Sequence, residues 1–184
     1  MGTTVLAGPV LDTVLTVGGP LLVILFYFEG LLIGKLVQPP AIFVAYIAIA
    51  LPSRVLLLGL SLACVGAWTL GQWTLYRSFD DQSPDYFGLR ERFPLLRELP
   101  ERAERQIGQQ RLTFVEDLFA HYGAPAICLL TMVPGIRGVT AVPAGLSTYP
   151  REKFLTATLV GNGIFVGLLV GIAYGLLDVV ELFL

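Results

Sequence analysis

Arg137 is the residue on which any chemistry in this chain would centre. It is the only formally charged residue between positions 119 and 146, in an otherwise apolar stretch, and Pro134 and Gly135 closely precede it. An arginine near the middle of a bilayer costs about 2.5 to 3.5 kcal/mol on insertion scales, so it normally faces a cavity or a partner. Its planar guanidinium suits two parallel hydrogen bonds to a lipid phosphate. The structural alternative is that Arg137 caps the carbonyls of a broken helix.

Glu29 is the natural counter-charge, because it is the only acid in the apolar run 21–51. It either carries a proton or simply forms a salt bridge with Arg137. Lys35 is the other charge of that run, and its long stem would let its ammonium reach the interface. We expect substrate contact from Glu29, Arg137, Pro134, Gly135, Thr131 and Asn162. We expect headgroup contact or topology anchoring from Lys35, Arg54, Arg151 and Lys153.

The sequence indicates no further chemistry. It shows no nucleophile paired with a base, no glycine-rich phosphate loop after a strand and no cluster of metal ligands, and His121 is its only histidine. Cys64 and Cys128 both lie within apolar runs, where small buried hydrophobes are expected rather than a disulfide. We therefore predict that the chain is not an enzyme and holds no metal and no cofactor.

The composition places these residues in a membrane. Of the 184 residues, 55% are hydrophobic and 14% are charged, whereas about a quarter of the residues of a typical soluble domain are charged. The formal net charge of -2 gives no electrostatic reason to expect nucleic acid as a partner. We predict a multi-pass protein of the cell membrane whose partners are membrane lipids.

Prolines divide the sequence around Arg137 into short pieces. Pro125, Pro134 and Pro143 recur every nine residues. Nine helical residues rise about 14 Å, roughly half of a ~30 Å hydrocarbon core. Residues 119–148 are therefore predicted to form a re-entrant hairpin, which enters to mid-depth and leaves by the same face.

The first apolar run is interrupted in a similar way. Pro39-Pro40 leaves only the 11 residues from Ala41 to Leu51 beyond it, which are too few to span. Residues 20–52 are therefore predicted to form a second re-entrant hairpin. In the N-terminal segment 1–19, Gly18 and Gly19 stand directly before Pro20, so any helix there is predicted to be short and to end before Pro20.

Two segments are long enough to cross a bilayer. The segment 53–78 contains 22 uncharged residues between Arg54 and Arg77, and the segment 151–182 contains 24 after Lys153. In the second segment, four glycines recur at four-residue steps, a pattern that lets another helix approach closely. This glycine stripe, which would contact either the facing hairpin or a second copy of the chain, consists of Gly163, Gly167, Gly171 and Gly175.

A charged, amphipathic linker, residues 79–118, joins the two halves. Positive residues collect on the face that the linker shares with Arg151 and Lys153, so that face is predicted to be cytoplasmic. One spanning helix separates the first hairpin from the linker, so the two hairpins enter from opposite faces. The predicted fold is an all-α membrane protein with a single domain, 1–184, built from two inverted repeats, each a re-entrant hairpin followed by a transmembrane helix. No repeat is visible at the level of individual residues.

The stretch from His121 to Phe165 resembles the DedA family, also called the VTT or SNARE-associated Golgi protein domain. The elements that carry the resemblance are Tyr122-Gly123, Pro134-Gly135-x-Arg137, Ala144-Gly145, Phe154 and Tyr174-Gly175. The resemblance extends over roughly residues 20 to 177. Family members usually carry an arginine where this chain has Thr131, and a second acid where it has Pro39-Pro40.

The resemblance implies a lipid transporter, which flips or scrambles anionic lipids such as polyprenyl phosphates or phospholipids between leaflets. Two alternatives stay open. One is a non-transporting scaffold or assembly protein, a homo-oligomer that associates through the glycine stripe. The other is a carrier of small ions or solutes on the same fold.

Overall fold

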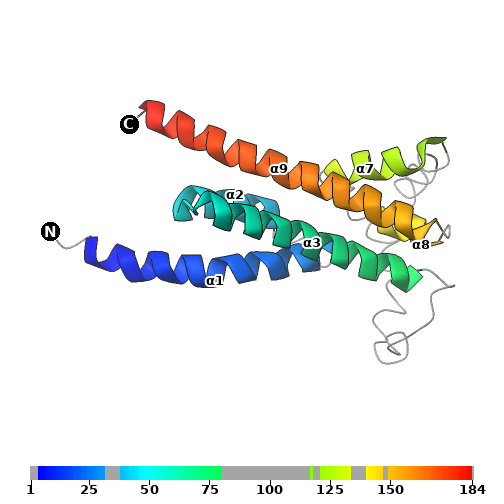
Figure 1. Ribbon diagram of the computed structural model, residues 1–184, viewed down its shortest axis with the longest axis horizontal. Helices are drawn as coiled ribbons and strands as arrows, with labels where there is room; N and C mark the ends of the chain where they lie inside the picture. Colours follow the sequence, from blue (N-terminus) through cyan, green and yellow to red (C-terminus); the bar gives the residue numbers. More distant parts are fainter. Residues whose placement is uncertain are drawn as a thin grey trace, which may run out of the picture.

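The computed structural model describes residues 4–31, 38–79, 117, 121–133, 140–146 and 149–183. All regular structure in these ranges is helical, which confirms the predicted all-α class for this part of the chain. Figure 1 shows the helices, which are α1 (Thr4–Gly30), α2 (Pro39–Ala50), α3 (Arg54–Phe79), α7 (Ala124–Met132), α8 (Ala141–Leu146) and α9 (Arg151–Phe183). The predicted linker 79–118 lies outside the described residues except for Phe79 and Asp117.

Two of these helices, α3 and α9, are long and apolar enough to cross a membrane. The spans are Arg54–Phe79 and Arg151–Leu176, of 26 residues each. A helix of this length reaches about 39 Å, which exceeds the ~30 Å hydrocarbon core. The predictions of a long apolar helix at 53–78 and at 151–182 are thus confirmed.

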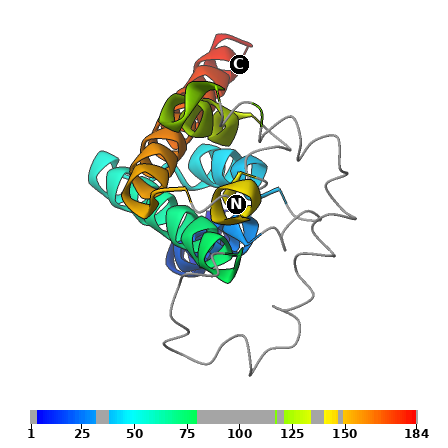
Figure 2. The ribbon, with the colours of Figure 1, turned by 90° about the vertical axis from the view of Figure 1, so that its right-hand side faces the viewer.

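The long helices α3 and α9 pack together and run in opposite directions, and the other helices lie around them (Figure 1). The first helix of each half packs on the long helix of the same half, α1 on α3 and α7 on α9. The second helix of each half packs on the long helix of the other half, α2 on α9 and α8 on α3. Viewed end-on, α2 and α8 lie on the same side of the α3–α9 pair, between α1 and α7 (Figure 2). The two halves therefore share one packing pattern.

The first helix differs from its prediction. It continues through Gly19 and Pro20 to Gly30, so the predicted end before Pro20 and the boundary between 1–19 and 20–52 are wrong. A proline removes one amide donor, but an apolar helix tolerates this loss where neighbouring helices support it. Next to Pro20, α1 lies close to α3, because a Cβ added at Gly19 would be 3.7 Å from Leu60 Cδ1.

The proline pair of the first hairpin begins a helix instead of interrupting one. Pro39 and Pro40 form the first turn of α2, where a missing amide proton leaves no hydrogen bond unmade. At its other end, α2 stops at Leu51, whose φ of 43° is left-handed. The backbone N–H of Leu51 donates to the carbonyl of Ile47 at 3.0 Å, and α3 begins three residues later.

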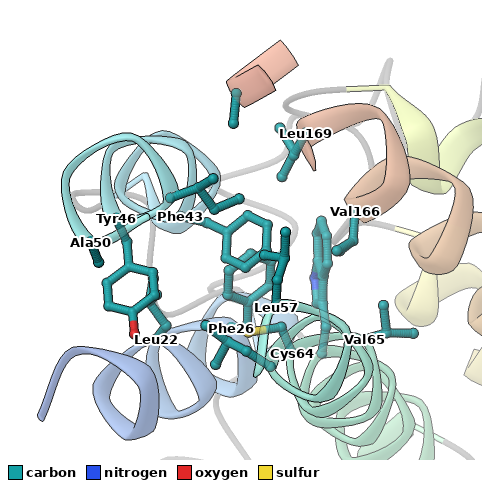
Figure 3. Close-up of a cluster of buried hydrophobic side chains, with 14 residues drawn as sticks. Leu22, Phe26, Phe43, Tyr46, Ala50, Leu57, Cys64, Val65, Val166 and Leu169 are labelled. Atoms are coloured by element: carbon teal, nitrogen blue, oxygen red, sulfur yellow. The ribbon is translucent and has the colours of Figure 1, made fainter. Parts of the chain in front are cut away.

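A hydrophobic core joins α1, α2, α3 and α9 (Figure 3). Phe26 is fully buried at its centre and makes edge-to-face contacts with Phe43 and Trp68, at ring-centroid distances of 5.8 Å and 5.3 Å. Cys64 is fully buried in the same core, as predicted, whereas Cys128 is only partly buried, and both are free thiols. Four segments that are distant in sequence are thus held together by one aromatic cluster.

A second core lies toward the opposite end, between α3, α7, α8 and α9. Tyr76 stacks on Phe154 with ring centroids 4.7 Å apart, and its hydroxyl donates a 2.5 Å hydrogen bond to the carbonyl oxygen of Tyr149. Its buried members come from every helix of the second half and from the end of α3. This cluster fixes the start of α9 against the end of α3.

The outer faces of the long helices are apolar. Large side chains with about half or more of their surface exposed include Leu58, Leu62 and Leu70 on α3 and Leu168 and Ile172 on α9. An apolar surface that continues over whole helices marks a membrane or a protein interface. Together with the length of α3 and α9, it indicates a membrane protein.

Candidate functional site

The polar centre of the protein lies where α3 meets α9. Gln72 and Asn162 are both fully buried. The Asn162 side-chain amide donates to Gln72 Oε1 at 2.9 Å and to Thr69 Oγ1 at 3.1 Å. The Thr69 hydroxyl in turn donates to the Val65 carbonyl at 2.8 Å. We call Thr69, Gln72 and Asn162 the amide cluster.

One hydrogen-bond acceptor of the amide cluster is unsatisfied. Oδ1 of Asn162 is buried and accepts no hydrogen bond among the described residues. Leaving such an atom unsatisfied costs about 1 to 3 kcal/mol. Buried polar groups without a full set of partners often mark the place where a ligand or a moving group is bound. The predicted role of Asn162 at the substrate is compatible with this position.

A glycine stands directly before each buried amide and brings one hairpin helix close. A Cβ placed on Gly71 would overlap the backbone carbonyl of Tyr27 and lie 3.0 Å from the Cα of Gly30. A Cβ placed on Gly161 would overlap the hydroxyl of Thr131 and lie 2.8 Å from the backbone carbonyl of Cys128. No larger residue fits at either glycine without moving a helix.

These contacts correspond between the two halves. In each half, a glycine of the long helix meets two residues spaced i and i+3 on the first hairpin helix, and an amide follows that glycine. The dipeptides are Gly71-Gln72 and Gly161-Asn162. The sequence analysis did not predict this correspondence between the two halves. The signal that could have predicted it is a glycine followed by an amide residue in both long apolar runs.

The amide cluster lies off-centre. Gln72 stands 18 residues after Arg54 but only five before Arg77, and Asn162 stands 11 residues after Arg151. These separations correspond to about 27, 8 and 17 Å along the helix axes. The cluster is therefore nearer the end of the molecule that carries Arg77 and Arg151 than the end that carries Arg54.

The end of α1 brings Gly30, the residue after Glu29, next to this cluster. Glu29 is half-buried in the last turn of α1. The residue after it, Gly30, is so close to α3 that a Cβ there would lie 2.9 Å from the backbone nitrogen of Gln72. The predicted partners Arg137, Pro134 and Gly135, and also Lys35, lie outside the described residues. The pairing of Glu29 with Arg137 stays a prediction.

Thr131 holds α7 against α9. It is fully buried, and its hydroxyl donates a 2.7 Å hydrogen bond to the Cys128 carbonyl beside Gly161. Thr131 stands where the DedA pattern carries arginine, and in this chain its side chain is part of the contact between α7 and α9. Its contacts in the described residues are those of a packing residue.

The predicted anchors lie at helix ends. Arg54 begins α3 and Arg151 begins α9, and both are exposed at opposite ends of the helix pair. Lys153 is exposed as well and lines a pocket of about 490 Å³ between α7 and α9. Arg77 lies over the ring of Trp73, with Cζ 5.9 Å from the ring centroid, near the same end as Arg151.

The glycine stripe does not pack as the spacing suggested. All four of its glycines are exposed, and a Cβ added to any of them would meet nothing within 4 Å. Neither hairpin, in its described part, covers the stripe. Among the described glycines, those that admit a neighbouring helix most closely are Gly30, Gly71 and Gly161, where an added Cβ would lie within 3.0 Å of α1, α3 or α7.

The described residues contain no group of three His, Cys, Asp or Glu side chains that could hold a metal ion. His121 is exposed, and its Nδ1 lies 3.2 Å from the Asp117 carbonyl oxygen. Comparisons of the chain with models of protein families, with curated proteins and with solved structures found no match. The function must therefore be argued from the amide cluster and from the helices that converge on it.

Proposed function

We propose that this protein moves anionic lipids, polyprenyl phosphates or phospholipids, between the leaflets of the cell membrane. The observation that carries the proposal is that two hairpin helices approach one buried polar cluster from opposite ends. Gly30 of α1 contacts the backbone of Gln72, Thr131 of α7 contacts Gly161, and the Asn162 amide joins the two halves. Figure 1 shows α1 and α7 on opposite ends of the bundle.

This convergence supports an inverted repeat of two re-entrant hairpins. In the first hairpin, the entering limb would be the apolar part of α1, Thr16–Gly30, which rises about 22 Å, and the rest of the 27-residue helix would lie outside the hydrocarbon core. The nine residues of α7 rise about 14 Å, so they cannot cross a ~30 Å hydrocarbon core. The 12 residues of α2 rise about 18 Å and are also too short. Broken helices that end inside the membrane are the places where secondary transporters bind their substrates. On this reading the segment 79–118 lies on the cytoplasmic side.

In the proposal, the charges of Glu29 and Arg137 make the translocation path selective for anionic lipids. Glu29 lies in the last turn of α1, directly before the Gly30 that meets Gln72, and Arg137 follows α7 by five residues in the sequence. In the proposal, the Arg137 guanidinium binds the lipid phosphate and Glu29 balances that cation when no lipid is present. The amide cluster offers polar atoms to the headgroup, while the acyl or prenyl chain stays among the exposed apolar side chains.

Leaflet exchange in proteoliposomes tests the proposal. The purified chain is reconstituted with fluorescent phosphatidylglycerol or a labelled polyprenyl phosphate, and the outer-leaflet label is quenched chemically over time. We expect the parent chain to accelerate exchange and Arg137→Ala and Glu29→Gln to slow it severalfold. Glu152→Gln, which removes an exposed acid at the start of α9, is the matched control and should exchange like the parent.

Two results would contradict the assignment. Equal exchange by the parent and Arg137→Ala would remove the proposed role of Arg137. Absence of exchange for the parent with either lipid, with the chain shown to be folded by circular dichroism, would remove lipid translocation itself.

One observation favours a second function, a membrane scaffold that associates with itself. The glycine stripe is exposed and unoccupied among the described residues, which is what a small-xxx-small contact with a second copy requires. This function predicts that Gly171→Leu dissociates the complex in detergent. It also predicts that neutralising Glu29 and Arg137 together is tolerated.

A further inference from the structure

A groove separate from the amide cluster lies between α3 and α9 on the outside of the bundle. Its volume is about 920 Å³. The walls are apolar side chains such as Leu58, Leu62 and Val170, and Gly163 and Gly167 form part of the lining. Arg54 is the only charged residue among those that line it.

The groove lies on the Arg54 side of the amide cluster. The two long helices are joined at the amide cluster and diverge from there toward the end that carries Arg54, as Figure 1 shows. The lining of the groove on α3 runs from Arg54 to Val65, about 17 Å along the helix axis. That length is roughly half of a ~30 Å hydrocarbon core, the depth of one leaflet.

The end of the groove at the start of α3 is cationic. Arg54 is exposed at the first position of α3, where the helix dipole also favours an anion, and it makes no ion pair within the described part of the chain. Tyr174, 42% exposed, lines the groove from α9. An aromatic ring with a polar tip next to a cation is typical of the headgroup level of a bilayer.

We propose that this groove binds one anionic phospholipid from the leaflet on the Arg54 side. Its phosphate pairs with the Arg54 guanidinium, and one acyl chain lies along Gly163 and Gly167. The apolar length of the groove and the position of its single cation at one end match an amphiphile with an anionic head. The site goes beyond the proposed translocation, because it is peripheral and uses none of Glu29, Arg137 or the amide cluster.

Substitutions of the stripe glycines can distinguish a bound lipid from a second copy of the chain as the occupant of this surface. A partner helix that packs along the stripe would contact all four glycines at their four-residue spacing. Only Gly163 and Gly167 line the groove, whereas Gly171 is equally exposed and equally free of neighbours but lies outside it. Gly167→Leu and Gly171→Leu are therefore a matched pair of variants, of which only Gly167→Leu adds a side chain inside the groove.

The experiment measures spin-labelled phospholipids around the full chain in phosphatidylcholine nanodiscs. We expect the parent to immobilise labelled phosphatidylglycerol in preference to labelled phosphatidylcholine. Gly167→Leu should abolish the preferentially immobilised component and Gly171→Leu should retain it. Arg54→Gln should abolish this preference, so that the chain immobilises labelled phosphatidylglycerol no more than labelled phosphatidylcholine. Leu58→Trp, at a position that is 63% exposed on the opposite wall, fills the groove without touching a glycine and should act like Gly167→Leu.

Several results would overturn the proposal. Equal losses in Gly167→Leu and Gly171→Leu, together with a change in oligomeric mass, would assign the stripe to a second copy. An unchanged phosphatidylglycerol preference in Arg54→Gln would refute the headgroup site. If Gly167→Leu fails to fold by circular dichroism, Leu58→Trp decides the question. Binding is read without leaflet exchange, so this proposal and the translocation proposal can fail independently.

Discussion

The substitution Gly71→Ala, which adds one methyl group, should test the packing of α1 on α3 most directly. A Cβ there would overlap the backbone carbonyl of Tyr27 and lie 3.0 Å from the Cα of Gly30. Both neighbours are backbone atoms, so no side-chain rotation can relieve the overlap. Gly71→Ala must therefore push α1 away from α3, and with it Glu29 away from the amide cluster.

The magnitude follows from two opposing terms. Overpacking of this kind costs about 1 to 3 kcal/mol, while replacing a mid-helix glycine by alanine stabilises by about 0.5 to 1 kcal/mol. We expect Gly71→Ala to lose about 0.5 to 2 kcal/mol of unfolding free energy, from the difference of these terms. The matched control is Gly66→Ala on the same helix, because Gly66 is exposed and a Cβ there meets nothing within 4 Å. It should gain about 0.5 to 1 kcal/mol.

The assay is reversible unfolding in mixed micelles with increasing dodecyl sulfate, followed by tryptophan fluorescence. Trp68 is fully buried three residues before Gly71, so in a Trp73→Phe background its emission reports the contact between α1 and α3. If Gly71→Ala were as stable as Gly66→Ala, the close approach of α1 to α3 would be refuted, and with it the packing on which the proposed function depends.

Two further predictions address the interior. Asn162→Leu and Gln72→Leu should each destabilise by about 0.6 to 2 kcal/mol, as interhelical hydrogen bonds in membranes do, and the double variant should lose less than the sum in the same unfolding assay. Strict additivity would mean that the two amides do not interact. Cys64 is fully exposed to reagent only after unfolding, because its side chain is 0% accessible in the folded protein. A maleimide should therefore label Cys128 first and Cys64 only in dodecyl sulfate, and equal labelling rates in the folded protein would contradict the described core.

The sequence was most informative where one physical rule dominates. The uncharged runs and their flanking charges predicted α3 and α9, because few other structures satisfy the backbone of such a run in lipid. Proline placement was less reliable. Pro20 lies inside α1 and costs that helix one hydrogen bond, whereas Pro39-Pro40 begins a helix at the position where proline is best tolerated.

Packing partners could not be read from spacing alone. The stripe that begins at Gly163 has the expected period but faces outward, whereas Gly161, two residues earlier, receives α7. Which side of a helix faces a neighbour depends on contacts made far away in the chain. For the same reason the hydrogen bond between Gln72 and Asn162, 90 residues apart, was not predictable from either residue by itself.

The off-centre position of the amide cluster has an electrical consequence. Moving one elementary charge across a whole membrane changes its energy by about 2.3 kcal/mol per 100 mV. On α3 the distance from Arg54 to Arg77 divides at Gln72 into about 27 Å and about 8 Å, so a charge that passes between the cluster and the Arg54 side crosses roughly three quarters of it, and the passage to the Arg77 side crosses roughly one quarter. If this distance carries the whole potential, the corresponding energies are about 1.8 and about 0.5 kcal/mol per 100 mV. In the proposed translocation, a membrane potential would thus act mainly on the longer passage of an anionic headgroup.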